Sequence, residues 1–270
     1  SPPWHGGGRE FKSRPVHHAR YRMEFSSSQV ESTLLKAGAL LAIMLTTGWM
    51  ARRGVRVNYT RKLNHVAIFF LPVAIDRQLN VATFADIEYL LTSSAIVTLS
   101  LLFFWEPIRS RFPPYQLMFE AFDRPEDRPY TLVWIFSQFV AGFMVMLPAI
   151  WYFGEIGLAG LILIPLLINA VGDGLAEPIG VRWGRHEYRT RALGTDRTYV
   201  RTLEGSGFIL LTGLVIIALH ASQFSGLQLA LALAIVPLAM TLAEAFSPHT
   251  WDTPFLMAAG YGGLLLVMQF

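Results

Sequence analysis

The chain has 270 residues, of which 53% are hydrophobic and 15% are charged, and its formal net charge is +3. This composition excludes an ordinary soluble domain, and the basic residues lie between apolar runs, not along one nucleic-acid-binding stripe. The chain has no cysteine, which excludes disulfides and thiolate metal sites. We therefore predict an integral membrane protein with no nucleic-acid partner.

A polar segment rich in Gly, Pro, Ser, His and Arg opens the chain. It has no long apolar stretch, so we expect residues 1–30 to form a polar tail. Residues 31–270 are then expected to form a single transmembrane domain.

Eight apolar runs follow the tail, each about as long as a helix that crosses a hydrocarbon core. They are residues 33–51, 65–84, 88–105, 130–153, 156–176, 205–222, 226–245 and 254–270. The second run is the weakest, because Asp76 and Arg77 interrupt it and an unpaired charge at mid-membrane costs about 2.5 to 3.5 kcal/mol. The fold class that we predict is all-α, with about eight transmembrane helices.

The charges between the runs support this count. If all eight runs cross, fifteen basic residues fall in loops on one side of the membrane and only Arg77 on the other. The basic residues of the tail fall on the sparsely charged side and do not fit this pattern. The loop EPIRSRFPPYQLMFEAFDRPEDRP has both charge signs and five prolines, and we expect it to be a solvated surface segment.

The segment TRKLNHVAIF marks the start of the second run. Its polar residues Arg61, Lys62 and His65 lie within one helical turn, on neighbouring faces. Two interpretations are open: a basic collar that anchors the helix end, or one wall of a binding site.

A second cluster begins where the fifth run ends, in GDGLAEPIGVRWGRHEYR. Asp173 supplies a hard oxygen ligand of the kind that magnesium prefers, and the flanking Gly172 and Gly174 allow a close backbone approach in a flexible loop. At the start of the sixth run, TLEGSGF offers free backbone N–H groups that attract anions. The alternative is that Asp173 and Glu204 only cap helices or pair with loop arginines.

The third cluster is AEAFSPHTWDTPF, between the last two runs. Glu244 lies at the end of a run and Asp252 just before the next, and an acid inside a span must be paired or coordinated. Ordinary loop polarity is the alternative for His249, Thr250 and Asp252.

The segments RKLNH, GDGLAEPIGVRWGRHEYR, RTLEGS and EAFSPHTWDTP carry a resemblance to a known family. In order and spacing, about residues 55–260 resemble the phytol kinase and dolichol kinase family of polyprenol kinases, which is related to CTP-using phosphatidate cytidylyltransferases. The resemblance implies a multi-span enzyme that phosphorylates a long-chain alcohol with CTP or another nucleoside triphosphate and Mg²⁺.

The same resemblance implies roles for individual residues. Asp173 would be a catalytic residue and magnesium ligand, with Glu244 and Asp252 supporting the metal. The triphosphate would be bound by basic, hydroxyl and glycine residues: Arg61, Lys62, Gly172, Gly174, Arg201, Thr202 and Ser206. His65 or Glu204 would take the hydroxyl proton, and the sequence does not choose between them.

Two positions depart from the family pattern. Val200 and Arg201 replace a lysine pair, and Thr253 replaces an asparagine after Asp252. These departures keep a second hypothesis open, in which the chain is a non-catalytic, kinase-like subunit of a larger organelle membrane complex. A third hypothesis is a transporter. It is disfavoured because the charges lie at the edges of loops and not at the midplane of the membrane.

The expected partners are a long-chain alcohol, bilayer lipids and a nucleoside triphosphate. The resemblance favours phytol or a similar prenyl alcohol over dolichol. It therefore favours a plastid membrane over a mitochondrial or endoplasmic reticulum membrane.

Overall fold

The structure is a computed structural model, and it describes residues 26–270 except residues 83 and 193. The predicted polar tail, residues 1–30, therefore lies outside the described residues as far as residue 25. Its last residues, from Ser27 on, already belong to the first helix, which Ser26 caps by accepting a hydrogen bond from the backbone of Gln29.

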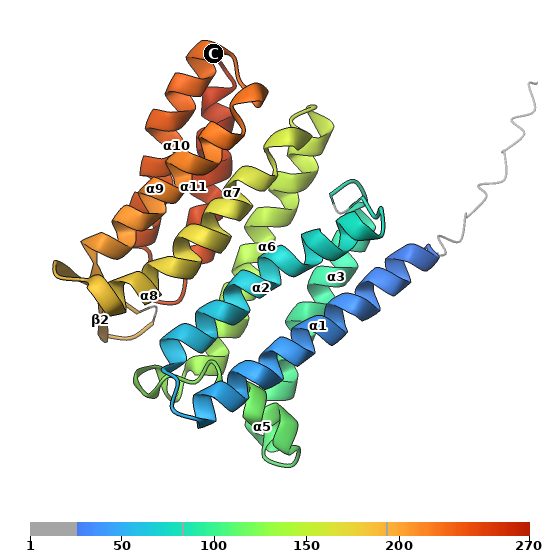
Figure 1. The fold of residues 1–270 in the computed structure, drawn as a ribbon, viewed down its shortest axis with the longest axis vertical. Coiled ribbons are helices and arrows are strands. Elements are labelled where there is room, and N and C mark those ends of the chain that lie inside the picture. The colour runs from blue at the N-terminus through green and yellow to red at the C-terminus, as the bar shows by residue number, and fades with distance from the viewer. Residues whose placement is uncertain (1–25, 83, 193) are drawn as a thin grey trace, which may run out of the picture.

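The described chain is a bundle of long helices with one β-hairpin (Figure 1). The first half contains α1 (Ser27–Arg52), α2 (Val57–Gln78), α3 (Ile87–Ser100) with η1 (Leu101–Phe104), the short α4 (Glu106–Arg109), α5 (Pro113–Glu120) and η2 (Pro125–Asp127), and α6 (Thr131–Glu155). The second half contains η3 (Ala159–Leu161), α7 (Leu163–Leu167), η4 (Ile168–Asp173), α8 (Gly174–Trp183), β1 (Glu187–Arg191), β2 (Thr198–Thr202), α9 (Leu203–Leu219), η5 (Ala221–Gln223), α10 (Gly226–Phe246) and α11 (Asp252–Val267).

Each predicted apolar run contains a helix, but not every helix has the length and composition of a membrane span. Among the described residues, five helices are long and apolar enough to cross: Ser27–Arg52, Ile87–Phe104, Thr131–Glu155, Ala159–Trp183 and Gly226–Phe246. Helices α9 and α11 are apolar but shorter. The helical membrane class is confirmed, while the count of eight spans stays a prediction.

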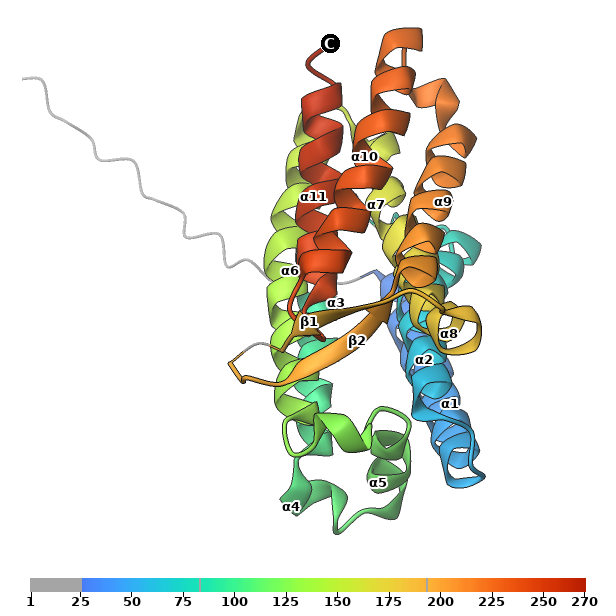
Figure 2. The same cartoon turned by 90° about the vertical axis from the view of Figure 1, so that its left-hand side faces the viewer.

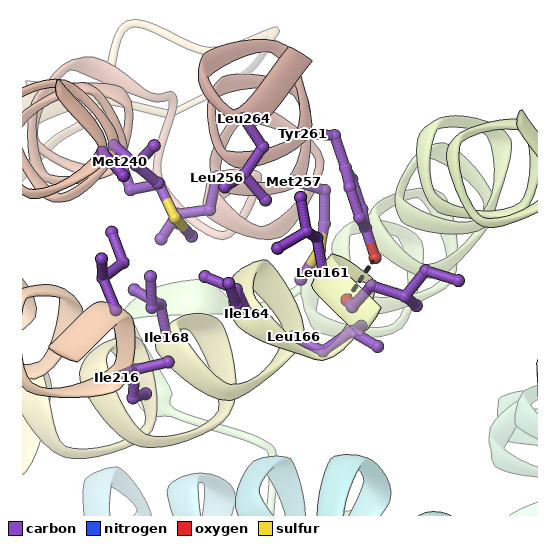
Figure 3. Packing of buried hydrophobic residues seen from close by; sticks show 14 of the residues in the cluster. Leu161, Ile164, Leu166, Ile168, Ile216, Met240, Leu256, Met257, Tyr261 and Leu264 are labelled. Atoms are coloured by element: carbon purple, nitrogen blue, oxygen red, sulfur yellow. Dashed lines mark hydrogen bonds between the residues drawn. The ribbon is translucent and has the colours of Figure 1, made fainter. Parts of the chain in front are cut away.

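The main apolar core lies among α6, α7, η4, α9, α10 and α11. Figure 3 shows Ile164 and Ile168 facing Met240 and Leu256, all fully buried. Small residues allow the helices to approach closely, as in membrane bundles generally. A Cβ atom on Gly260 would lie 2.8 Å from Cβ of Pro165, so this position admits only glycine without a shift.

The charge inside the second run is neutralised across the bundle. Asp76 is fully buried and pairs with Lys36 of α1, whose Nζ lies 2.5 Å from Oδ1 of Asp76, while Ser32 donates its hydroxyl to the same oxygen. The neighbouring Arg77 is exposed at the last turn of α2. Helix α2 therefore keeps an acid within an apolar bundle because α1 supplies its counter-ion.

The prediction of a solvated segment between the third and fourth runs is wrong in part. This stretch folds into α4, α5 and η2, and its last residues turn inward. Arg124 and Asp127 are only 4% and 2% exposed. The prolines and mixed charges indicated a loop, but they did not show that an ion pair would be buried against other segments.

The arginine-rich loop after the fifth run contains the antiparallel hairpin β1–β2, which the all-α prediction did not include. Figure 2 shows the hairpin crossing below the lower ends of α10 and α11. Two hydrogen bonds hold it against the turn between those helices: Thr190 Oγ1 donates to the Ser247 carbonyl at 3.0 Å, and the His249 N–H donates to the Arg191 carbonyl at 2.8 Å.

Candidate functional site

Asp173 lies inside a helix and not in a flexible loop. The span continues from Ala159 to Trp183, and Asp173 ends its π-helical segment η4, a distortion that is frequent at functional sites. The flexibility expected at Gly172 and Gly174 is not found, because both glycines lie within the helical span and Gly174 has α-helical backbone angles. A Cβ on Gly174 would lie 2.8 Å from Cγ2 of Val66, and one on Gly172 would lie 3.3 Å from Cα of Ile209. The two glycines let α2 and α9 pack closely beside Asp173.

Lys62 and His65 of α2 both face Asp173. Lys62 Nζ donates to both carboxylate oxygens at 2.9 Å, and the two residues are 5% and 3% exposed. His65 Nε2 lies 3.4 Å from Oδ2 of Asp173 and 3.2 Å from the carbonyl oxygen of Asn169. Both neighbours are acceptors, so Nε2 carries the hydrogen and Nδ1 is the basic atom of the neutral ring. A basic collar that only anchors the helix end does not explain these contacts, because Lys62 and His65 point into the bundle toward Asp173.

Glu177 lies one helical turn after Asp173 and binds three donors. Arg61 Nη2 donates to its Oε2, and Asn58 Nδ2 and Arg124 Nη1 donate to its Oε1, each at 2.7 Å. The side chains of Arg61 and Glu177 are 17% and 18% exposed. Solvent therefore reaches this network on the Glu177 side.

Arg124 continues the network to the turn before α11. Its Nε donates to Asp127 at 2.8 Å and its Nη2 contacts Nε2 of His249 at 2.6 Å. Because arginine only donates, His249 Nε2 accepts and the ring is neutral. Burial, together with the positive charge of Arg124 and against the opposing effect of Asp127, lowers the pKa of His249 to about 4. Tyr199 stacks on the ring with centroids 3.6 Å apart.

Arg201 links the hairpin to α10. Its Nη1 lies 3.2 Å from Oε1 of Glu244, whose Oε2 accepts a 3.0 Å hydrogen bond from Ser206. Asp252 accepts a 2.9 Å hydrogen bond from Gln138 and interacts electrostatically with Lys62 and Arg201. The three sequence clusters thus adjoin one another in space.

We call this assembly the charged cluster. It consists of Arg61, Lys62, His65, Arg124, Asp127, Asp173, Glu177, Arg201, Ser206, Glu244, His249 and Asp252. Most of the predicted site residues are therefore brought together from segments that are far apart in the sequence. Glu177, Arg124 and Asp127 were not predicted. The spacing of four residues from Asp173 to Glu177, which places both acids on one helix face, is the sequence signal by which Glu177 could have been found.

Two predicted residues have local partners instead. Glu204 is 26% exposed and pairs with His186, whose Nδ1 lies 2.8 Å from Oε1. Thr202 is the N-cap of α9 and accepts a hydrogen bond from the Gly205 N–H at 3.2 Å. Glu204 thus pairs within its own loop, as in the alternative stated for it, although its partner is a histidine and not an arginine, and Thr202 caps a helix.

The predicted magnesium ligands do not form a ready-made metal site. In the described part of the chain, no three His, Asp or Glu side chains are placed to hold one ion together. Each predicted ligand has a protein donor instead: Lys62 for Asp173, Arg201 for Glu244 and Gln138 for Asp252. This arrangement does not fit a bound Mg²⁺.

Unsatisfied polar atoms lie beside the charged cluster. Asn169 is fully buried one turn before Asp173, and neither its Oδ1 nor its Nδ2 has a hydrogen-bond partner among the described residues. The same holds for Nε of Arg61 and Oγ1 of Thr250. Such atoms are rare in folded proteins, and they are available to the polar atoms of a ligand.

Comparison of the chain with protein-family models, curated proteins and solved structures found no match. The resemblance to polyprenol kinases therefore rests on the sequence motifs alone. The geometry adds that these motifs meet in one largely buried, highly charged cluster.

Proposed function

We propose that this protein is a membrane-bound lipid-alcohol kinase that transfers phosphate from CTP or another nucleoside triphosphate to phytol or a related prenyl alcohol. The observation that carries the proposal is the convergence of the four motif segments in the charged cluster. A cluster of buried charges is costly to assemble, and in a membrane protein it is a functional-site hypothesis by default.

The chemistry requires positioning and charge neutralisation more than covalent help from the protein. In this proposal, Arg61 and Lys62 exchange their carboxylate partners for phosphate oxygens. The alcohol oxygen attacks the terminal phosphorus, the bond to the bridging oxygen of the nucleoside diphosphate breaks, and the hydroxyl proton moves to Nδ1 of His65. We favour His65 over Glu204 because Glu204 pairs with His186 outside the cluster.

In this proposal the nucleotide reaches the charged cluster from water at the cluster's solvent-accessible edge, and the alcohol reaches it from the lipid on the other side. Arg61 and Glu177 provide that edge. The orphan amide of Asn169 lies on the helix one turn deeper than Asp173 and is available to the alcohol hydroxyl or to a phosphate oxygen.

A second candidate function, a non-catalytic kinase-like subunit, is favoured by one specific observation. Both oxygens of Asp173 are already bound by Lys62, and every other carboxylate of the charged cluster also has a protein donor. A network that is satisfied within the chain can hold helices together without any ligand.

A transfer assay separates the two functions. The protein is purified in detergent and supplied with CTP labelled at the terminal phosphate, with and without Mg²⁺, and with phytol, farnesol or dolichol. Asp173→Asn is the test variant, and Asp196→Asn in the exposed hairpin turn is the matched control. We expect transfer to phytol that Asp173→Asn abolishes and Asp196→Asn preserves. Absence of both transfer and CTP binding in the unaltered protein contradicts the kinase proposal and favours the subunit.

A further inference from the structure

A cavity of about 700 Å³ lies outside the charged cluster and shares no residue with it. It lies where the span Ile87–Phe104 ends and α6 begins, and α4 and α5 form its other walls. The volume is within the range of small-molecule sites. Figure 2 shows α4 and α5 together at the lower end of the molecule, next to the first turns of α6.

Arg109 is the distinctive group of this cavity. Its guanidinium stacks on the Phe119 ring, with Cζ 3.8 Å from the ring centroid. Its Nε is buried without a hydrogen-bond acceptor, and within the described chain the guanidinium has no carboxylate partner. A stacked arginine with free donors is prearranged for a planar or tetrahedral oxyanion, because little side-chain freedom remains to be lost on binding.

Besides Arg109, the cavity is lined by one ion pair and by one acid that has no partner among the described residues. Arg128 and Asp123 neutralise each other, with Nε 2.8 Å from Oδ2, and Thr131 donates to the second oxygen of Asp123 at 2.8 Å. Glu106, three residues before Arg109 on α4, also lines the cavity, and its side chain has no partner among the described residues. The cavity therefore presents one unpaired cation and one unpaired anion.

The depth of the cavity matches a lipid headgroup. Phe104 ends one apolar span and Thr131 starts another, so the cavity lies at the level where the hydrocarbon core ends. Its rim has two large exposed apolar residues, Trp105 at 59% and Val133 at 62%. Tryptophan at such a boundary is typical of contact with headgroups and the first methylene groups.

From these observations we propose that the cavity binds the headgroup of a zwitterionic phospholipid. The phosphodiester accepts hydrogen bonds from Arg109, the ammonium group lies at Glu106, and the glycerol end of the lipid runs out between Trp105 and Val133. The balanced charges disfavour a lipid with a single negative charge, which would leave Glu106 unpaired beside it.

Native mass spectrometry of the detergent-purified protein tests this site. The protein is titrated with dioleoylphosphatidylcholine, with dioleoylphosphatidylglycerol or with inorganic phosphate. We expect one phosphatidylcholine to be retained, with about tenfold weaker retention in Arg109→Gln. Arg111→Gln is the matched control, because Arg111 is an exposed arginine two residues away that does not line the cavity.

A second variant covers the case in which Arg109→Gln fails to fold. Glu106 is exposed, so Glu106→Gln should fold normally, and we expect it to weaken phosphatidylcholine retention and strengthen phosphatidylglycerol retention. Equal retention of both lipids by the unaltered protein overturns the zwitterionic assignment. Displacement of the lipid by millimolar phosphate, or equal loss in Arg111→Gln, overturns the lipid site itself.

Discussion

Lys62 Nζ lies 2.9 Å from both carboxylate oxygens of Asp173, so one ion pair joins α2 to the π-helical segment before α8. Both residues are almost completely buried. The pair therefore connects two helices and also lies at the centre of the candidate site. Its contribution to stability and its contribution to activity can be measured separately.

Replacing Lys62 by Met should destabilise the protein strongly, by about 3 to 5 kcal/mol, because it leaves Asp173 as an uncompensated buried charge. The double variant Lys62→Met/Asp173→Leu should recover most of this loss, since neither charge then remains. Denaturant unfolding of the purified protein in detergent measures both. A double variant as unstable as Lys62→Met alone would show that the pair is not the cause.

Replacing Gly174 by Ala should lower the unfolding temperature. The added Cβ would lie 2.8 Å from the stiff Val66 side chain and push α8 away from α2. The matched variant is Gly207→Ala on α9, where no atom lies within 4 Å of the added carbon. It should be neutral or stabilising by up to about 1 kcal/mol, because alanine favours the helix. Equal effects of the two variants would contradict the close approach of α8 to α2.

The neutral His249 predicts a loss of stability in acid. Its pKa is about 4 in the folded protein, against an ordinary value of 6.5. Below pH 6.5 the unfolded chain binds a proton at His249 that the folded chain does not bind. The free energy of unfolding therefore decreases as the pH is lowered from 6.5 to about 4. The slope is about 1.4 kcal/mol per pH unit.

His249→Gln tests this slope, because the glutamine oxygen can accept from Arg124 but does not titrate. Unfolding temperatures are compared between pH 7 and pH 4 for both proteins. We expect the acid-dependent decrease to be shallower in the variant. Parallel curves would mean that other groups control the acid sensitivity.

Two buried asparagines should respond in opposite ways to leucine. Asn169 has no hydrogen-bond partner among the described residues, so Asn169→Leu should leave stability unchanged or raise it by about 1 kcal/mol or more. Asn64 donates to Thr47 Oγ1 and the Thr60 carbonyl at 2.8 Å, so Asn64→Leu should be destabilising. Thermal unfolding in detergent measures the pair. Destabilisation of both would indicate that a water or another group satisfies Asn169.

Helix positions and the membrane class followed from local pattern. The hydrophobicity of a run is a property of that segment alone, and a long apolar run is most stable as a helix in the membrane. Each of the eight runs accordingly contains a helix. The motifs at the ends of the second, fifth, sixth and seventh runs also indicated Lys62, Asp173, Arg201 and Glu244 as candidate site residues.

The same local reasoning failed where a residue depends on a distant partner. The span Ala159–Trp183 continues through Gly172 and Gly174 because α2 and α9 pack against them, whereas glycine in isolation favours a loop. Arg124 and Asp127 were expected in solvent, and only their contacts with Glu177 and His249 explain their burial.

The sequence by itself thus determined a helical membrane protein with its basic residues concentrated between spans, because hydrophobicity and charge act along the chain. Only the tertiary structure decided which acid pairs with which cation, that Glu204 lies outside the charged cluster, and that Arg109 keeps free donors in a cavity. Those outcomes depend on contacts between residues far apart in the sequence. They are set by how whole helices pack, which no local pattern specifies.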